Sequence, residues 1–359
     1  MNIAVFTKTE MCGGSEIRGV ELCNAIARHT PHQAYLLSER GIPRQLQERL
    51  DAAVKSLSNV FVEGGNTPIL YEMDSIVVIN TDSKQFTTID YWQGRSKRHQ
   101  CWVDLGRIRQ LTFLFNFIVS PAQHLWQIEE LCKDVRIIVA NMRFLNEIAT
   151  DDRYIRVRHL PRMMLESPID PTTVCTEKNA SACVRIGKHS HAVDGKFNEE
   201  HFQLIERVNT RHRQAIEWDF MGVPQAREHE LVSIPNVTCR SVFSLPVLEY
   251  LKGVHIFLFF ISWKRQEPWA RSIAEAMMSG CPILATDTDG GNRVQVLHGS
   301  NGYLCRSVNE FADRLCELIE NPARLAMMGR NSRIYSRTFT SEEVIRRLLN
   351  FLGQCDGCI

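Results

Sequence analysis

The chain has 359 residues, of which 44% are hydrophobic and 23% charged, and its net charge at pH 7 is +1. This length is long for one hydrophobic core and predicts two domains. The balanced charge gives no indication of a nucleic-acid-binding protein. No apolar run approaches the length needed to span a bilayer, and no signal peptide begins the chain. We therefore expect a cytoplasmic protein, with peripheral contact at the inner membrane face left open.

Twelve cysteines are scattered through the chain without a regular spacing. Cys355 and Cys358 form the one C-x-x-C pair, at the C-terminal end. One pair does not complete a four-ligand zinc site, so we expect reduced thiols here. The role of this tail stays open.

The first residues predict the opening unit of a doubly wound α/β domain. A strand at residues 2–6 runs into a loop containing Gly13 and Gly14, and a helix follows through about Arg28. Glycines allow the backbone to turn sharply and to approach a ligand closely. The loop is not G-x-G-x-x-G, which disfavours a dinucleotide cofactor.

Strands and helices then alternate, which predicts a parallel sheet. Ligands of such sheets gather at the carboxyl ends of strands. That rule selects Asn80, Asp104 and Asn141. The strands expected here are residues 33–38, 59–62, 75–80, 100–104, 135–141 and 155–161.

The domain boundary is expected at a polar, proline-containing stretch. We predict an N-terminal domain over residues 1–165, a linker over 166–180 and a C-terminal domain over 181–340. Residues 341–359 are predicted to hold a final helix, and its return to the first domain is left open.

The most informative stretch lies in the second domain, between two predicted strands at residues 254–261 and 283–286. Apolar residues at helical spacing predict a helix there. Glu267 stands at the turn before this helix, and Glu275 lies eight positions on (275 − 267), on roughly the same side. A helix start suits a phosphate, and a carboxylate beside it accepts hydrogen bonds from sugar hydroxyls. The alternative is an amphipathic helix with solvated or capping glutamates.

The segment EPWARSIAEAMMSGCPILATD resembles the Glu-x7-Glu signature of retaining GT-B glycosyltransferases of the fourth family, the glycosyl transferases group 1. The resemblance is dense from residue 182 to 352 and sparse before. It implies two doubly wound Rossmann-like domains facing a cleft. It also implies retaining transfer of a hexose or pentose from a UDP-, GDP- or other nucleoside-diphosphate sugar to a hydroxyl acceptor, without a metal or other cofactor.

The resemblance assigns roles to residues of this chain. Glu267 would hold the transferred sugar and Glu275 the ribose hydroxyls. Asp104 replaces the usual active-site histidine as a catalytic candidate, although it could instead cap a turn. The remaining donor-binding candidates are Gly13, Gly14, Lys188, Lys196, Gly222, Ser244, Trp269, Ala270 and Arg271. Lys188 and Lys196 would hold the diphosphate together with the helix start, because the leaving group gains negative charge. A solvated lysine-rich turn is the alternative.

Asp287 and Asp289 form an Asp-x-Asp pattern that invites a metal-site hypothesis. We reject it, because the pattern follows a predicted parallel strand and precedes Gly290 and Gly291, as in the acceptor-side loop of the GT-B family.

Other functions of the same architecture remain open. A sugar-nucleotide epimerase would act without an acceptor, a phosphorylase would need phosphate, and a non-catalytic relative would only bind the nucleotide sugar. Glycan or glycolipid synthesis is favoured. The acceptor is expected to be a saccharide, a glycolipid or another hydroxyl-bearing molecule, and a nucleic-acid acceptor is not excluded.

Overall fold

The computed structural model describes residues 1–7, 14–38, 41–60, 65–80, 103–116, 120–174, 177–179, 181–242 and 244–353. The chain divides into two compact units, the first made of Met1–Pro168 with Ser341–Ile359 and the second of Ile169–Thr340. The division falls inside the segment predicted as a linker. Gly13, Cys355 and Cys358 lie outside the described residues.

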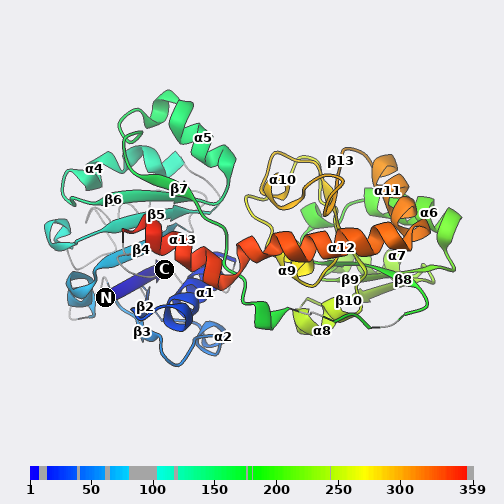
Figure 1. The fold of residues 1–359 in the computed structure, drawn as a ribbon, viewed down its shortest axis with the longest axis horizontal. Coiled ribbons are helices and arrows are strands. Elements are labelled where there is room, and N and C mark those ends of the chain that lie inside the picture. Colours follow the sequence, from blue (N-terminus) through cyan, green and yellow to red (C-terminus); the bar gives the residue numbers. More distant parts are fainter. Residues whose placement is uncertain are drawn as a thin grey trace. The chain divides into compact units, whose positions relative to one another are not determined.

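The first unit is built on a seven-stranded parallel sheet of order β3-β2-β1-β4-β5-β6-β7 (Figure 1). Side chains alternate between its two faces along each strand. In β1, Ala4 and Phe6 face one core, which α4 and α5 cover, while Ile3 and Val5 face the core under α1 and α13. The strands are β1 (Asn2–Thr7), β2 (Gln33–Ser38), β3 (Lys55–Leu57), β4 (Ser75–Asn80), β5 (Leu111–Phe115), β6 (Val135–Val139) and β7 (Arg162–Met164). The helices are α1 (Gly14–His29), α2 (Arg44–Gln47), α4 (Trp126–Glu129), α5 (Met142–Thr150) and α13 (Ser341–Phe351), with 3-10 turns η1 (Thr67–Glu72), η2 (Leu105–Arg107), η3 (Ser120–His124) and η4 (Asp152–Tyr154).

Three predicted strands of this unit are wrong. Residues 103–104, 59–60 and 155–161 are not strands in the structure. The strands near them are β5, β3 and β7. Leu111–Phe115 is buried throughout, the pattern of an interior parallel strand, whereas the predicted strand at 100–104 ends in an aspartate that caps a turn.

The C-terminal helix α13 completes the core of the first unit. Its apolar residues Val344, Ile345, Leu348 and Leu349 are buried among residues of α1 and of the adjacent sheet face. The Arg347 guanidinium also lies 2.7 Å from the Glu166 carboxylate, within the same unit. The helix therefore covers apolar side chains of α1 and of the sheet that the first 168 residues of the unit do not cover.

We expect Leu348→Ala to lower the free energy of unfolding by about 2–5 kcal/mol, because it leaves a cavity under a fully buried helix face. The exposed neighbour Arg346 offers the control, since Arg346→Ala should change the stability by less than about 0.5 kcal/mol. Chemical denaturation followed by circular dichroism measures both. Equal losses in the two variants would contradict this packing.

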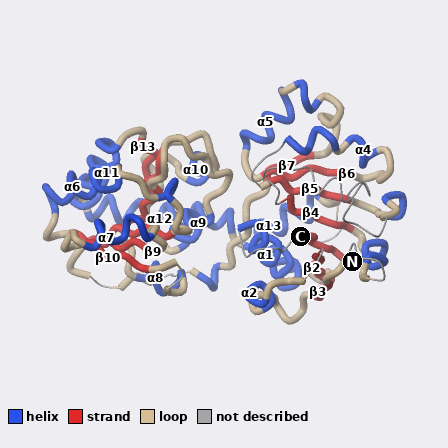
Figure 2. The backbone as a smooth tube through the Cα atoms, turned by 180° about the vertical axis from the view of Figure 1, so that it is seen from behind, coloured by secondary structure: helices blue, strands red, loops and turns tan. Residues whose placement is uncertain are grey.

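The second unit holds a six-stranded parallel sheet of order β10-β9-β8-β11-β12-β13. Helices cover both faces (Figures 1 and 2). The strands are β8 (Val184–His189), β9 (Ile216–Met221), β10 (Val237–Arg240), β11 (Ile256–Phe259), β12 (Ile283–Thr286) and β13 (Gly302–Cys305). The helices are α6 (Glu200–His212), α7 (Gln225–Val232), α8 (Val247–Lys252), α9 (Arg271–Met278), α10 (Asn292–Gln295), α11 (Val308–Glu320) and α12 (Pro322–Ser336), with 3-10 turns η5 (Pro171–Thr173), η6 (Asp194–Lys196) and η7 (Arg337–Phe339).

The strand order of the second unit reverses between β8 and β11. From β8 the chain continues outward to β9 and β10, and from β11 it continues in the other direction to β12 and β13. The connections that follow β8 and β11 therefore diverge, and ligands of doubly wound sheets bind at such a point. These two connections carry Lys196 and Glu267. Across the described ranges, no helix has the length and apolar character needed to cross a membrane.

Candidate functional site

Glu267 lies at the reversal point of the second sheet, in the loop between β11 and α9. Its side chain is only 13% exposed, and its Oε1 accepts a hydrogen bond from Arg265 Nε at 2.8 Å and lies 3.2 Å from Lys196 Nζ. Lys196 ends η6, in the connection that follows β8. The two divergent connections thus bring one carboxylate and two cations together.

Backbone contacts hold these two connections in place. The N–H of Ser262, after β11, donates to the carbonyl of Gly195 at 3.0 Å. A Cβ on Gly195 would lie 3.1 Å from Nη1 of Arg265, so glycine leaves the guanidinium room beside the turn. Arg265 was missed by the sequence reasoning. Its position two residues before Glu267 was the available signal.

The cations decide the ionisation of Glu267. Burial by itself raises the pKa of this carboxyl, but Lys196 and Arg265 outweigh the burial, so the pKa lies below its usual value. The Glu267 side chain is therefore a carboxylate at neutral pH. An ionised carboxylate is a hydrogen-bond acceptor only, which suits it to receive hydroxyl groups.

Glu275 is the second carboxylate of the site and lies on α9. Its side chain is 8% exposed, and Oε1 accepts a hydrogen bond from Arg271 Nε at 2.7 Å, one helical turn earlier. Oε2 lies 3.5 Å from Nε2 of His189, the last residue of β8. Arg271 and His189 therefore flank the two oxygens of one carboxylate.

His189 is a residue that the sequence reasoning did not select. Burial lowers the pKa of its imidazole, against the opposing effect of Glu275. The ring is packed edge-on against Tyr250 and Phe257, with centroid distances of 5.8 and 5.3 Å. It is a neutral imidazole beside the Glu275 carboxylate at neutral pH. Its position at the carboxyl end of a central strand was the signal that should have selected it.

The start of α9 is held by a side chain from α10. The N–H of Ala270 donates to Oε1 of Gln295 at 3.2 Å. The assignment of Ala270 to the donor site stays a prediction. Arg271 is the first residue of the helix, and Trp269 precedes it with its ring edge against Phe339 at 4.8 Å between centroids.

Lys188 is buried and bonded to the backbone, which corrects the prediction that it holds the donor diphosphate. It is only 2% exposed, and its Nζ donates to the carbonyl of Phe260 at 2.6 Å. The ammonium also lies 5.0 Å from the centroid of the Phe197 ring. Side chains two apart in a strand share a face, and Lys188 shares the face of the buried Ile186. It connects β8 to the end of β11 rather than reaching a diphosphate.

The buried Lys188 should make stability depend on pH. Burial lowers its folded-state pKa well below the usual 10.5. Between that lowered pKa and 10.5 the unfolded chain binds more protons than the folded chain, so stability rises with pH across this window. Lys188→Met should flatten that rise, and the exposed Lys252→Met should not. Thermal unfolding at several pH values measures it, and parallel wild-type and Lys188→Met curves would refute this role.

Asp104 caps a turn at the edge of the first sheet where strands begin. Its carboxylate accepts the N–H of Gly106 at 3.1 Å and caps η2, and its own N–H is bonded to Tyr71 Oη at 3.0 Å. The turns η2 and η1 precede β5 and β4, so Asp104 lies where strands begin, opposite their carboxyl ends. The proposed catalytic role is therefore not supported, and the turn-capping alternative is correct. Asn141 likewise caps α5.

The remaining predicted residues lie at ends of strands or helices. Gly14 is the first residue of α1, directly after the loop that follows β1. Gly222 directly follows β9 with φ at +89°, and a Cβ there would lie 1.8 Å from the carbonyl oxygen of Ser190, so this position requires glycine. Ser244 is exposed between β10 and α8, and its N–H donates to Ser241 O at 3.2 Å.

Several buried polar atoms without a hydrogen-bond partner lie near the carboxyl ends of β8, β11 and β12, and others lie elsewhere in both units. Buried polar groups are normally hydrogen-bonded, so unsatisfied ones call for an explanation such as a ligand. Among the described residues, the unsatisfied atoms in these segments are His189 Nε2, Ser190 Oγ, Trp269 Nε1, Thr288 Oγ1 and Asn292 Oδ1. All five belong to the segments that surround Glu267 and Glu275.

The aspartates of the Asp-x-Asp pattern form ion pairs with arginines. Asp287 lies 2.7 Å from Arg293 and 2.9 Å from Arg306, while Asp289 is mostly exposed. Within the part of the chain that is described, no group of three or more His, Cys, Asp or Glu side chains is arranged to hold a metal ion. Asp287 acts here as an anchor for the loop before α10.

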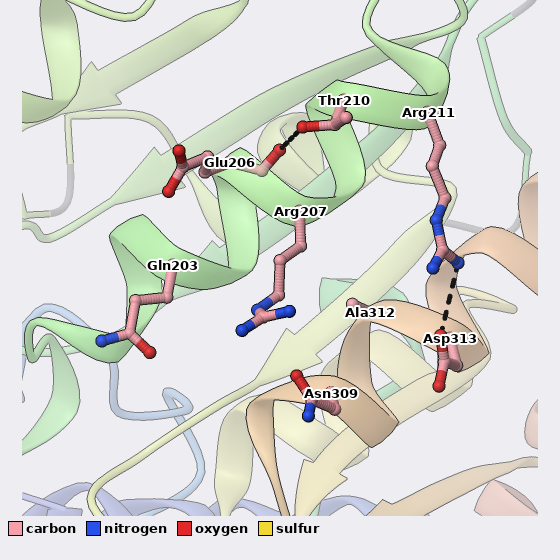
Figure 3. A pocket seen from close by; sticks show the side chains of 8 residues that line it. All are labelled: Gln203, Glu206, Arg207, Thr210, Arg211, Asn309, Ala312 and Asp313. Carbon is pink, nitrogen blue, oxygen red and sulfur yellow. Dashed lines mark hydrogen bonds and ion pairs between the residues drawn. The ribbon is translucent and has the colours of Figure 1, made fainter.

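A separate cavity of about 600 Å³ lies between α6 and α11 and contains none of the predicted site residues. Figure 3 shows Arg207 pointing between Gln203 and Asn309, while Arg211 pairs with Asp313 at 3.3 Å. Its lining side chains are predominantly exposed. Since the carboxylate pair lies elsewhere, this cavity is not the candidate donor site.

The fold has close structural counterparts. A glycosyltransferase from Rickettsia africae superposes with a TM-score of 0.72 at 11% identity, covering 99% of each chain. HepE from Anabaena, in a complex with UDP, superposes with a TM-score of 0.71 at 15% identity, covering 98% of this chain and 100% of that one. The two parallel-sheet Rossmann-like units thus have the GT-B architecture.

Sequence comparison points to the family. Residues 237–335, which include Glu267 and Glu275, match the family described as glycosyl transferases group 1. The resemblance of this segment to the glycosyl transferases group 1 is thereby confirmed. The match covers most of the second unit.

Two curated relatives are similar over parts of their length. D-inositol 3-phosphate glycosyltransferase of Gordonia bronchialis is 36% identical over 78 residues, which is 21% of this chain and 17% of the relative. Poly(ribitol-phosphate) alpha-N-acetylglucosaminyltransferase of Staphylococcus aureus is 20% identical over 268 residues, 71% of this chain and 49% of the relative. The aligned regions therefore span less than half of either relative.

Proposed function

We propose that the protein is a glycosyltransferase that moves a sugar from a nucleoside-diphosphate sugar to a hydroxyl acceptor with retention of configuration. The observation that carries the proposal is the grouping of Lys196, Glu267, Arg271 and Glu275 at the reversal point of the second sheet. The family match over residues 237–335 and the UDP bound by the structural relative HepE support the same class of donor.

Each group has a role in this proposal. Lys196 and the amino end of α9 bind the diphosphate, where cations and backbone N–H groups stabilise the charge of the leaving group. Glu275, oriented by Arg271, accepts hydrogen bonds from the ribose hydroxyls. Glu267, kept ionised by Lys196 and Arg265, accepts hydrogen bonds from hydroxyls of the transferred sugar. With these cations the reaction needs no metal ion.

The chemical step needs no nucleophile from the protein. The bond between the anomeric carbon and the phosphate oxygen breaks, and the acceptor oxygen forms its bond on the same face. The acceptor proton passes to the departing phosphate oxygen. Exclusion of water from the site would suppress hydrolysis. We propose that the acceptor is a saccharide or glycolipid and that the first unit contributes to binding it.

A thermal-shift panel of UDP-, GDP- and ADP-sugars tests the proposal, followed by an assay of nucleoside-diphosphate release with any sugar that stabilises the protein. We expect one nucleotide class to raise the melting temperature and to release its diphosphate slowly by hydrolysis. Conversion of the bound nucleotide sugar to its epimer without an acceptor would favour the epimerase alternative. Absence of any stabilisation would refute the proposal.

Lys196→Met should move the acidic limb of the pH profile of turnover to higher pH. In the wild type the cations outweigh burial and hold the Glu267 pKa below its usual value. Without Lys196, burial has the larger influence, so the carboxyl should take up a proton at a higher pH. The profile of kcat/KM for the nucleotide sugar found in the panel measures this. An acidic limb at the wild-type pH would contradict the pairing of Lys196 with Glu267.

A further inference from the structure

The helix that carries Glu275 begins on a residue that cannot cap it. The N-cap of α9 is Ala270, in an extended conformation with φ −99° and ψ 98°, and no side chain of its own caps the helix. The first N–H groups of any helix lack partners within the helix, and a serine, threonine, aspartate or asparagine at the N-cap usually binds one of them. An alanine offers no capping oxygen from its side chain, and the N–H of Ile273 donates to the Ala270 carbonyl at 3.1 Å instead.

A side chain from α10 holds Ala270 instead. The carboxamide of Gln295 accepts the N–H of Ala270 at 3.2 Å and donates through Nε2 to the carbonyl of Ala270 at 2.9 Å. These two hydrogen bonds, to the N–H and the carbonyl of one residue, resemble those that a neighbouring β-strand would make. Gln295 is 0% exposed, and Asn301 Nδ2 donates to its backbone carbonyl at 3.0 Å, so its own position is fixed.

The loop before α10 also contacts the backbone of Glu267 directly. The N–H of Gly291 donates to the carbonyl of Glu267 at 2.8 Å. A Cβ on Gly291 would lie 2.1 Å from the carbonyl of Pro268, and one on Gly290 would lie 2.7 Å from the carbonyl of Glu267. The glycine loop and Gln295 therefore contact the backbone of one turn, which runs from Glu267 to Ala270.

We propose that Gln295 is a positioning residue that replaces the missing helix cap. It fixes Ala270 through the backbone N–H and carbonyl of that residue. No side chain of the cap residue then competes with an anionic ligand for the N–H of Ser272 on α9. Glu267 and Arg271, on either side of Ala270, are positioned by the same contact. This inference rests on the proposed function, since it concerns how the site is kept open for the diphosphate of the donor.

Two substitutions with opposite effects on stability test the inference. Gln295→Leu removes both hydrogen bonds and should lower the melting temperature, weaken UDP binding about tenfold and reduce turnover. Ala270→Ser supplies a capping hydroxyl and should raise the melting temperature by about 2–4 °C. It should nevertheless weaken UDP binding several-fold, about threefold or more, because the hydroxyl occupies an N–H group meant for the ligand. A merely structural role would let affinity follow stability in both variants.

The control is Gln110→Leu, which removes another buried carboxamide in the first unit, one that bonds to Ser75 and Asp134. It should lower the melting temperature without changing UDP affinity. Calorimetry with UDP, or with GDP if the panel selects it, gives the affinities.

If the wild type binds the nucleotide and both Gln295→Leu and Ala270→Ser bind it equally well, this inference fails but the proposed function does not. If Gln295→Leu does not fold, unchanged affinity in Ala270→Ser overturns it. If the wild type binds no nucleoside diphosphate, the proposed function fails with it.

Discussion

Replacement of Glu267 with glutamine is expected to lower the turnover of the nucleotide sugar about a thousandfold. The carboxylate lies in the loop after β11, where Lys196 at 3.2 Å and Arg265 at 2.8 Å keep it ionised. Glutamine retains the size of the side chain but loses the negative charge and one acceptor oxygen. The interaction that strengthens as the sugar departs is then lost, so kcat should fall more than affinity for the donor.

Steady-state kinetics with the nucleotide sugar, together with thermal unfolding, measures this effect. The matched control is Glu249→Gln, because Glu249 also pairs with a lysine, Lys252 at 2.7 Å, but on the exposed surface of α8. We expect wild-type kinetics from the control and a folded but nearly inactive Glu267→Gln protein. Glu267→Ala should be as inactive. Turnover within about threefold of the wild type would remove Glu267 from the reaction.

Glu275→Gln should act chiefly on donor binding and raise the dissociation constant for the nucleoside diphosphate about 10- to 100-fold. The Glu275 carboxylate is nearly buried, with Arg271 on one oxygen and His189 near the other. Hydrogen bonds from ribose hydroxyls to this charged group contribute equally before and during the reaction. The change should therefore appear in KM and affinity, while kcat at saturating donor falls much less.

A matched control for this variant is Glu317→Gln on α11. Glu317 pairs with Arg314 one turn away at 2.8 Å, as Glu275 pairs with Arg271, but it lies outside the candidate site. Calorimetry with UDP or GDP should detect weaker binding in Glu275→Gln alone. A loss confined to kcat, with affinity preserved, would show that Glu275 has a different role.

The sequence predicts the second unit better than the first. Strand β12 has the predicted bounds and is buried throughout, and β2 and β4 of the first unit also have theirs. In the first unit, residues 100–104 were predicted as a strand from the alternation of strands and helices, and that prediction is wrong for residues 103–104. The buried apolar run of β5, Leu111–Phe115, carried the stronger physical signal and was overlooked.

The candidate site was predicted in part. The sequence pattern correctly predicts that Glu267 lies in the turn before α9 and Glu275 on the helix itself. The prediction for Lys188 considered its charge and not the face of the strand on which it lies. Side chains alternate along β8, so Lys188 lies on the same face as Ile186, inside the core. By the same alternation His189 faces the other side, next to Glu275.

Gln295 and Arg265 depend on loop conformations that spacing alone does not predict. Gln295 reaches Ala270 across 25 positions of the chain because the loop before α10 is pressed against the turn of Glu267. No local pattern marks a glutamine that pairs with a distant backbone group. Such contacts appear only when the positions of the loops after β11 and β12 are known.

The central claim is that Lys196, with the amino end of α9, binds the diphosphate of the donor. Calorimetric titration of UDP and GDP into the wild type, Lys196→Met and the surface control Lys252→Met tests it most directly. We predict that one nucleotide binds the wild type and the control equally, and binds Lys196→Met at least about tenfold more weakly. Equal affinity in all three proteins, or no binding to the wild type, would contradict the account.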